Sequence, residues 1–124
     1  MTQCRGIRGA TTANANTREA ILEATQELLE ELMKKNQVDQ ESVAAAIFST
    51  TPDLNAEFPA VAARTKLGWE HIALFNTHEM AVPNDAPKCI RVLLLVNTDK
   101  ASRDLVNLYL RGAINLRSRG TTQS

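Results

Sequence analysis

One amphipathic segment constrains the fold of this chain more than any other feature. Between positions 16 and 36, apolar residues recur at intervals of three and four, and charged residues occupy the opposite side. This spacing predicts an α-helix of about five turns whose apolar face must be buried against another layer. Asn16 followed by Glu19 resembles a capping box at the helix start, and Asn36 is the predicted end. The face predicted to be buried consists of Ile21, Leu22, Thr25, Leu28, Leu29, Leu32 and Met33.

Segments with the character of β-strands lie on both sides of that helix. Residues 88–98 are the most apolar of them, and we expect them to form a central strand. A short helix is expected at about 57–66, because Gly68 is a typical stop signal. Further strands are predicted at 3–12, 43–50, 72–77 and 106–116, the last from its alternation of apolar and polar residues.

This order of elements predicts an α/β (α+β) fold, in which a mixed five-stranded sheet packs against one long helix. One helix rarely covers a whole sheet, so we expect an oligomer that buries the remainder. Internal repeats and linkers are absent from the sequence. We therefore expect a single domain over residues 1–124, in which 117–124 form a flexible C-terminal tail.

Charge and cysteine content point to a cytoplasmic protein. The 14 Lys and Arg residues balance the 14 Asp and Glu residues, so bulk charge favours neither nucleic acid nor an anionic membrane as a partner. Cys4 and Cys89 belong to no metal-binding or disulfide motif, which fits a reducing compartment. His71 and His78 flank a predicted strand and should point to opposite faces, so no metal site is expected. The first residues lack the apolar stretch of a signal peptide.

Arg91 is the most informative residue, because it interrupts the most apolar strand of the chain. A buried guanidinium is unfavourable unless it meets an anion that satisfies its donors. Arg91 therefore either binds an anionic ligand, lies on a solvent-facing side of its strand, or pairs with a carboxylate inside the protein. The sequence pattern leaves these three possibilities open.

Other charged and polar residues follow the same strands. Arg8 lies in the first strand, Glu79 follows the third, and Tyr109 lies on the polar side of the last. Each could be an ordinary surface residue, as could Arg64 on the short helix. Together, the strand residues could instead form a pocket for a small dicarboxylate.

Four sequence segments resemble the monofunctional, AroH-class chorismate mutases. The resemblance extends from about residue 4 to 117, with the segments in the same order and at the same spacing. It rests on RGIRGATT at 5–12, TPDLNAEFPA at 51–60, EM at 79–80 and KCIRV at 88–92. It implies a homotrimer that converts chorismate to prephenate at three subunit interfaces, without a cofactor or a metal.

The resemblance also implies roles for individual residues. Arg8 and Tyr109 match the pair that binds the side-chain carboxylate of the substrate. Arg91 matches the arginine aimed at the ether oxygen, and Glu79 matches the carboxylate near the ring hydroxyl. These four residues are the predicted catalytic group.

The remaining matches are substrate-binding residues. They are Phe58, Ala60 and Arg64 in a wall supplied by the adjacent subunit, Leu74, Phe75 and Leu116 in the apolar lining, and Arg117 at the start of a mobile C-terminal segment. Two positions depart from the family pattern. Asn76 replaces a cysteine that contacts the ring hydroxyl, and an amide can make the same contact. Val61 replaces a lysine near the ring carboxylate, for which Arg64 is the alternative cation.

Two other functions compete with this prediction. A trimeric metabolite-binding or imine-deaminase protein of the RidA-like type would also place an interface arginine on a carboxylate. A purely structural interaction domain would use the same arginines in internal salt bridges. Disappearance of chorismate in the presence of the protein would distinguish these possibilities.

Overall fold

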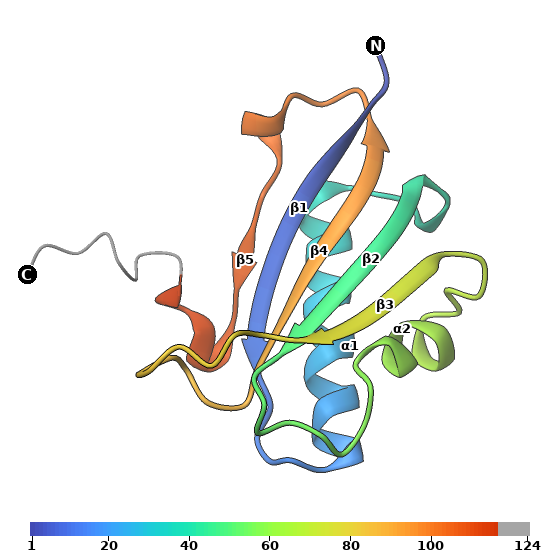
Figure 1. Ribbon diagram of the computed structural model, residues 1–124. Helices are drawn as coiled ribbons and strands as arrows, with labels where there is room; N and C mark the ends of the chain where they lie inside the picture. Colours follow the sequence, from blue (N-terminus) through green and yellow to red (C-terminus); the bar gives the residue numbers. More distant parts are fainter. Residues whose placement is uncertain (117–124) are drawn as a thin grey trace, which may run out of the picture.

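The computed structural model describes residues 1–116, which form one sheet and two α-helices (Figure 1). The predicted tail at 117–124, and Arg117 with it, lies outside the described residues. None of the helices in the described part is long and apolar enough to cross a membrane. In chain order the elements are β1 (Gln3–Thr12), α1 (Arg18–Asn36), β2 (Val43–Thr50), α2 (Ala60–Lys66), β3 (Ala73–His78), β4 (Cys89–Thr98) and β5 (Leu108–Tyr109), with 3₁₀ turns at Gln40–Ser42, Ser102–Asp104 and Arg111–Ala113.

The five strands form one mixed sheet in the order β3-β2-β4-β1-β5. The most apolar strand, β4, is central as predicted and pairs antiparallel with both β1 and β2. The outer pairs, β2 with β3 and β1 with β5, are parallel. The predicted α+β fold with a mixed five-stranded sheet is therefore confirmed.

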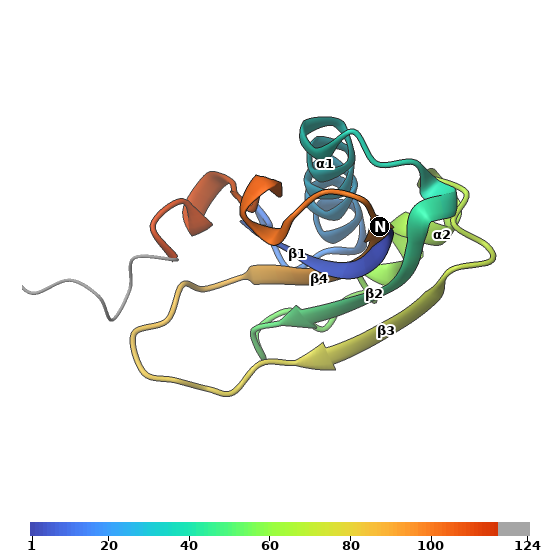
Figure 2. The same cartoon turned by 90° about the horizontal axis from the view of Figure 1, so that it is seen from above.

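Both helices pack on the same face of the sheet, and α1 runs along most of its length (Figure 2). The leucine stripe of α1 meets alternate residues of the strands, as their period of two requires. Complete burial of such side chains contributes about 1.5–3 kcal/mol each to the free energy of unfolding. The centre of this core consists of Ile7, Leu28, Leu29, Leu32, Phe48, Leu94 and Val96, all fully buried.

The opposite face of the sheet carries no helix among residues 1–116 (Figure 2). Two rows of paired residues cross this open face. One row runs Thr77, Ser49, Arg91, Ala10, Tyr109, and the other runs Phe75, Ile47, Leu93, Arg8. Phe75 is 65% exposed and Ile47 36%, which is unusual for large apolar side chains on a sheet.

The prediction of a strand at 106–116 is wrong for most of that range. Only Leu108–Tyr109 pairs with β1, and a 3₁₀ turn follows at Arg111–Ala113. Arg111 adopts a left-handed conformation with φ of 51°, and its Nε donates to Glu27 Oε1 on α1 at 3.0 Å. The chain therefore turns toward the helix at this point, and Ile114, predicted among the strand's apolar set, is 67% exposed.

Both helix starts also differ from the prediction. Thr17, and not Asn16, caps α1, because Thr17 Oγ1 accepts a hydrogen bond from Ala20 N at 3.1 Å. Asn16 instead accepts two backbone hydrogen bonds from the loop at 55–56. The short helix begins at Ala60 rather than at residue 57, with Pro59 in the cap position.

Close packing of α1 on β1 depends on Gly9. A Cβ atom at this position would lie 2.6 Å from Leu32 Cδ1 and 3.0 Å from Leu28 Cδ1, both in the core. Gly9→Ala should therefore lower the free energy of unfolding by about 1–3 kcal/mol, the range for an overpacked core. Urea unfolding at matched protein concentration measures this difference.

Gly6→Ala is the matched control, since it lies on the same strand but on the open face. Its Cβ would meet only Leu93 Cδ1, at 3.3 Å. We expect a clearly smaller loss than for Gly9→Ala. Equal losses in the two variants would contradict this account of the helix–sheet contact.

Candidate active site

A cavity of about 360 Å³ opens on the uncovered face of the sheet. It spans β1, β2, β4 and β5, and five of its lining residues were predicted from the sequence: Arg8, Glu79, Arg91, Tyr109 and Leu116. The other lining residues are Gly9, Ala10, Ile47, Ser49, Val92 and Leu93. The cavity therefore combines an apolar floor with two arginines, one carboxylate and one phenol.

Arg91 is held between two carboxylates. Its Nη2 donates to Asp85 Oδ2 at 2.8 Å, and its Nη1 lies 3.4 Å from Glu79 Oε2. The Arg91 side chain is 30% exposed, and those of Glu79 and Asp85 are 28% and 8% exposed. Arg91 thus pairs with carboxylates, one of the possibilities left open by the sequence, and it also lines a cavity.

Arg8 contrasts with Arg91 because its guanidinium forms no ion pair within residues 1–116. It lies on β1, one row along the open face from Arg91. Its backbone N–H donates to Asn107 Oδ1 at 2.8 Å, which ties β1 to the segment before β5. The cavity therefore contains one cation that is paired with two carboxylates and a second, Arg8, that is available to the carboxylate of a ligand.

Tyr109 and Leu116 enter the cavity from the last described segment of the chain. Leu110 N donates to Ala10 O at 2.8 Å, and Gly112 N donates to Thr12 Oγ1 at 3.0 Å. These bonds hold the two-residue strand β5 and the following turn against the end of β1. The positions of Tyr109 and Leu116 therefore depend on contacts with β1 and not on a long strand that contains them.

Cys89 lies beneath this end of the cavity, in a small cluster with Ala10 and Ala113. It is fully buried and free. Burial raises the pKa of the Cys89 thiol above its ordinary value, although the nearby Arg91 guanidinium acts in the opposite direction. A buried, protonated thiol is a poor nucleophile, so Cys89 is a packing residue here.

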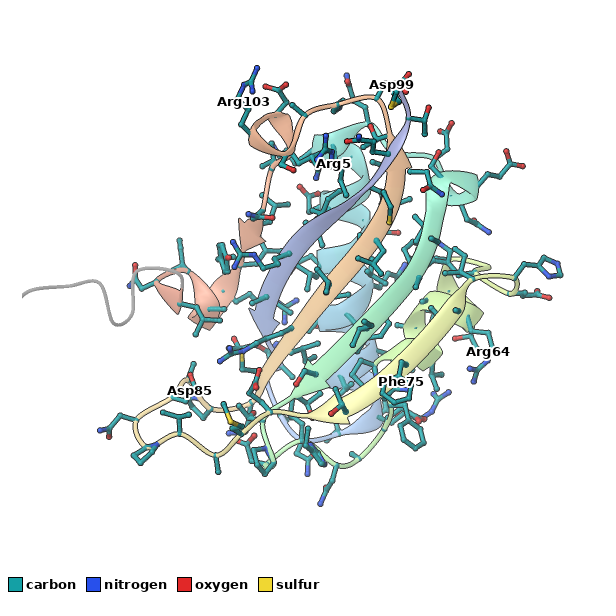
Figure 3. All side chains as sticks on the ribbon, turned by 45° about the horizontal axis from the view of Figure 1, so that its top comes forward. Arg5, Arg64, Phe75, Asp85, Asp99 and Arg103 are labelled. Carbon is teal, nitrogen blue, oxygen red and sulfur yellow. The ribbon has the colours of Figure 1, made fainter. Side chains whose placement is uncertain are left out.

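Among residues 1–116, the other predicted site residues do not line this cavity. Phe58 is 63% exposed and, with Asn76, lines a second cavity of about 300 Å³. Arg64 is exposed on α2, the helix that contacts the edge strand β3, and Phe75 lies on β3 itself. Figure 3 shows both side chains on the β3 side of the sheet, away from Asp85. The β3 edge is opposite to the β5 edge that carries Tyr109.

Three of the predicted residues lie on the helix side of the sheet instead. Ala60 is buried in the core, and Leu74 packs against it. Asn76 also points to that side, because its Oδ1 accepts a hydrogen bond from Ala60 N at 3.1 Å and so ties β3 to the start of α2. The predicted residues are therefore divided between two regions of one chain.

The residues around the cavity that were not predicted include Ile47, Ser49 and Asp85. Ile47 and Ser49 share the parity of the open face of β2, so an alternation analysis of that strand could have found them. Asp85 lies in a loop, and the sequence carries no signal for it beyond its position six residues before Arg91. Its role depends on how the loop folds back over β4.

Comparison with known proteins assigns the family. Residues 4–119 match the family model for chorismate mutase type I. The chain belongs to this family. The matches give no support to the RidA-like alternative.

Relatives agree over nearly the whole chain. The chain is 42% identical over 113 residues to the chorismate mutase AroH of Bacillus subtilis, covering 91% of this chain and 89% of that protein. It is 45% identical over 114 residues to the chorismate mutase AroH of Thermus thermophilus, covering 91% and 93%. A solved chorismate mutase from Clostridium thermocellum superposes with a TM-score of 0.85 at 46% identity, covering 87% of this chain and 96% of that one.

The environment of Cys89 predicts its reactivity. In a Cys4→Ser variant, the remaining thiol should react only slowly with a thiol reagent at neutral pH and rapidly in denaturant, because burial excludes the reagent and disfavours the thiolate. Absorbance with a chromogenic disulfide measures both rates. Cys89→Ser, which retains only the exposed Cys4, is the control for reagent reactivity. Rapid labelling of Cys89 in the folded protein would contradict the described burial.

Proposed function

We propose that this isomerase converts chorismate to prephenate in the cavity on the open face of the sheet. Family membership supplies the reaction, which belongs to the biosynthesis of aromatic amino acids. One observation supports this location above all others. A guanidinium on the central strand, Arg91, shares a cavity with an unpaired cation, Arg8, and a phenol, Tyr109.

The substrate explains why the cavity needs both arginines. Chorismate carries two carboxylates, and a pericyclic rearrangement requires its flexible enolpyruvyl arm to fold over the ring. Arg8 and Tyr109 would bind the carboxylate of that arm, since the Arg8 guanidinium has no ion pair in the described residues. Holding the reactive conformer removes part of the ordering entropy from the barrier.

The reaction also develops charge as the C–O bond lengthens ahead of C–C bond formation. Negative charge collects on the ether oxygen, where Arg91 would donate a hydrogen bond. Positive character on the ring would be balanced by Glu79. Fixed charges in a site with little water stabilise such a transition state without reorganisation, which removes the need for a cofactor or a covalent intermediate.

The active site should be completed by a second copy of the chain. Within residues 1–116, the charges of Arg8 and Arg91 are matched in number by those of Glu79 and Asp85, so this part of one subunit offers a dianion no net positive charge. Arg64, exposed on α2, forms no ion pair among residues 1–116 and would supply charge from a neighbour. The predicted wall residue Phe58 lines a cavity with Asn76 of β3, and the predicted lining residue Phe75 lies on the same edge strand.

The open face of the sheet supports the same conclusion. Phe75 and Ile47 pair side by side and leave apolar surface exposed on this face, and a cyclic trimer would bury them at its centre. Each subunit would then present its β3 edge to the cavity of the next.

Location of the protein in the cytoplasm stays a prediction from the cysteine content.

Arg91 should be essential for catalysis. Arg91→Lys keeps the positive charge but loses the fork of N–H donors, which is held by two carboxylates in the structure. We expect a loss of roughly 3 kcal/mol of transition-state stabilisation, or about 150-fold in kcat. Loss of chorismate absorbance measures the rate, and Arg103→Lys at an exposed position is the matched control. Wild-type kcat in Arg91→Lys would refute the assigned role.

A shared active site predicts complementation between inactive variants. Arg91→Ala should be inactive and Arg64→Ala strongly impaired, because each damages a different half of every site. Co-refolding the two in equal amounts should restore roughly a quarter of wild-type activity, the product of two independent chances of one half in a ring. The readout is chorismate turnover per assembled trimer.

The matched control mixes two variants of the same half. Arg91→Ala and Arg8→Ala both alter the strand side of the cavity, so no interface in their mixture has an intact pair. This mixture should stay inactive. If the Arg91→Ala and Arg64→Ala mixture also stays inactive while mixed trimers demonstrably form, the shared-site model is wrong. A monomeric mass for the wild type would equally refute it.

A further inference from the structure

Asp85 makes the shortest contact of any group with the Arg91 guanidinium. Its Oδ2 lies 2.8 Å from Nη2, within the range of charge-assisted hydrogen bonds, whereas Glu79 is 3.4 Å from Nη1. The Asp85 side chain is also the more buried of the two, at 8% exposure against 28%. A shorter and drier ion pair is the stronger one, so Asp85 dominates the orientation of Arg91.

The guanidinium depends on this contact because one of its donors is unsatisfied. Arg91 Nε is buried and has no hydrogen-bond partner in the described part of the chain. Only the two Nη groups anchor the planar head against rotation. Nη2 donates a hydrogen bond to Asp85 and Nη1 forms an ion pair with Glu79, so the two groups, which carry four hydrogens, keep donors for a ligand.

Asp85 is itself held in place by its loop. Its Oδ1 accepts a hydrogen bond from Ala86 N at 2.9 Å, and its backbone N–H donates to Val82 O at 3.3 Å. Figure 3 shows Asp85 on the loop between β3 and β4, well away from Arg64 and Phe75. Asp85 does not line the cavity. It therefore contacts Arg91 from outside the cavity and would not touch a substrate bound there.

We propose that Asp85 is a positioning residue that sets the orientation of Arg91 toward the reacting ether oxygen. This inference rests on the proposed function of the cavity. Asp85 has a second effect, because its charge completes a balance of two cations, Arg8 and Arg91, with two carboxylates, Glu79 and Asp85. It thus improves catalysis by Arg91 while it weakens binding of a dianionic substrate.

Two substitutions separate these effects. Asp85→Asn removes the charge but keeps an oxygen that can accept from Arg91 Nη2. Asp85→Ala removes both the charge and the acceptor. Chorismate turnover should show a lower KM in both variants, by about fivefold at low salt for one charge at a separation of several ångströms. Only Asp85→Ala should lose kcat, by about tenfold or more, because only there is the guanidinium free to rotate.

Salt dependence and a second aspartate provide the controls. The decrease in KM should shrink as added salt screens the charge. Asp53→Asn is the matched control, since Asp53 also bonds a strand end, through Thr51 Oγ1 and Lys88 N, without contacting Arg91. Asp53→Asn should have the kcat of the wild type and the same salt dependence of KM. Thermal unfolding confirms that each variant is folded at the assay temperature.

The outcomes distinguish this inference from the proposed function. The positioning role alone would be overturned if Arg91→Lys loses activity relative to an active wild type while a folded Asp85→Ala keeps the kcat of the wild type. Equal losses of kcat in Asp85→Asn and Asp85→Ala would overturn it too, because they would tie the effect to charge and not to orientation. A folded wild type that does not consume chorismate would overturn the proposed function and this inference with it.

Discussion

A single helical layer covers one face of the sheet, and the organisation of the molecule depends on this asymmetry. The leucine stripe of α1 packs against alternate residues of β1, β2 and β4, and Gly9 lets the helix approach closely. Because side chains of a strand alternate between faces, the residues between them must point to the other side. That side has no helix to cover it, so whatever it carries is available for a ligand or for another copy of the chain.

The central position of β4 gives the open face its chemistry. Arg91 occupies one of the alternate positions of a strand whose other face is fully buried, so its backbone is fixed by neighbours on both sides. The cost of placing a guanidinium on such a strand is offset by Glu79 and Asp85, which approach from the segment between β3 and β4. A charge held in this way needs little reorganisation when a reaction develops charge beside it.

The regular elements were predictable because each has a local cause. The period of α1, the apolar run of β4 and the composition of β2 and β3 are properties of neighbouring residues, and all four were found within about one residue. The region after Leu108 was not, since alternation alone cannot show that Arg111 bonds to Glu27 and turns the chain toward α1. Asn16 and Thr17 show the same limit, because either can cap a helix and a distant loop engages Asn16.

By itself, the sequence determined the fold class, the family and the identities of the residues at the centre of the cavity, because strand parity and family motifs are written along the chain. Only the tertiary structure decided which of those residues meet. It placed Arg8, Glu79, Arg91 and Tyr109 around one cavity and left Phe58, Arg64 and Phe75 toward the opposite edge of the sheet. It also brought Asp85 onto Arg91, a contact that no spacing indicates. Ion pairs form between side chains that the whole fold brings within a few ångströms, and that proximity is not a property of either residue's neighbours in sequence.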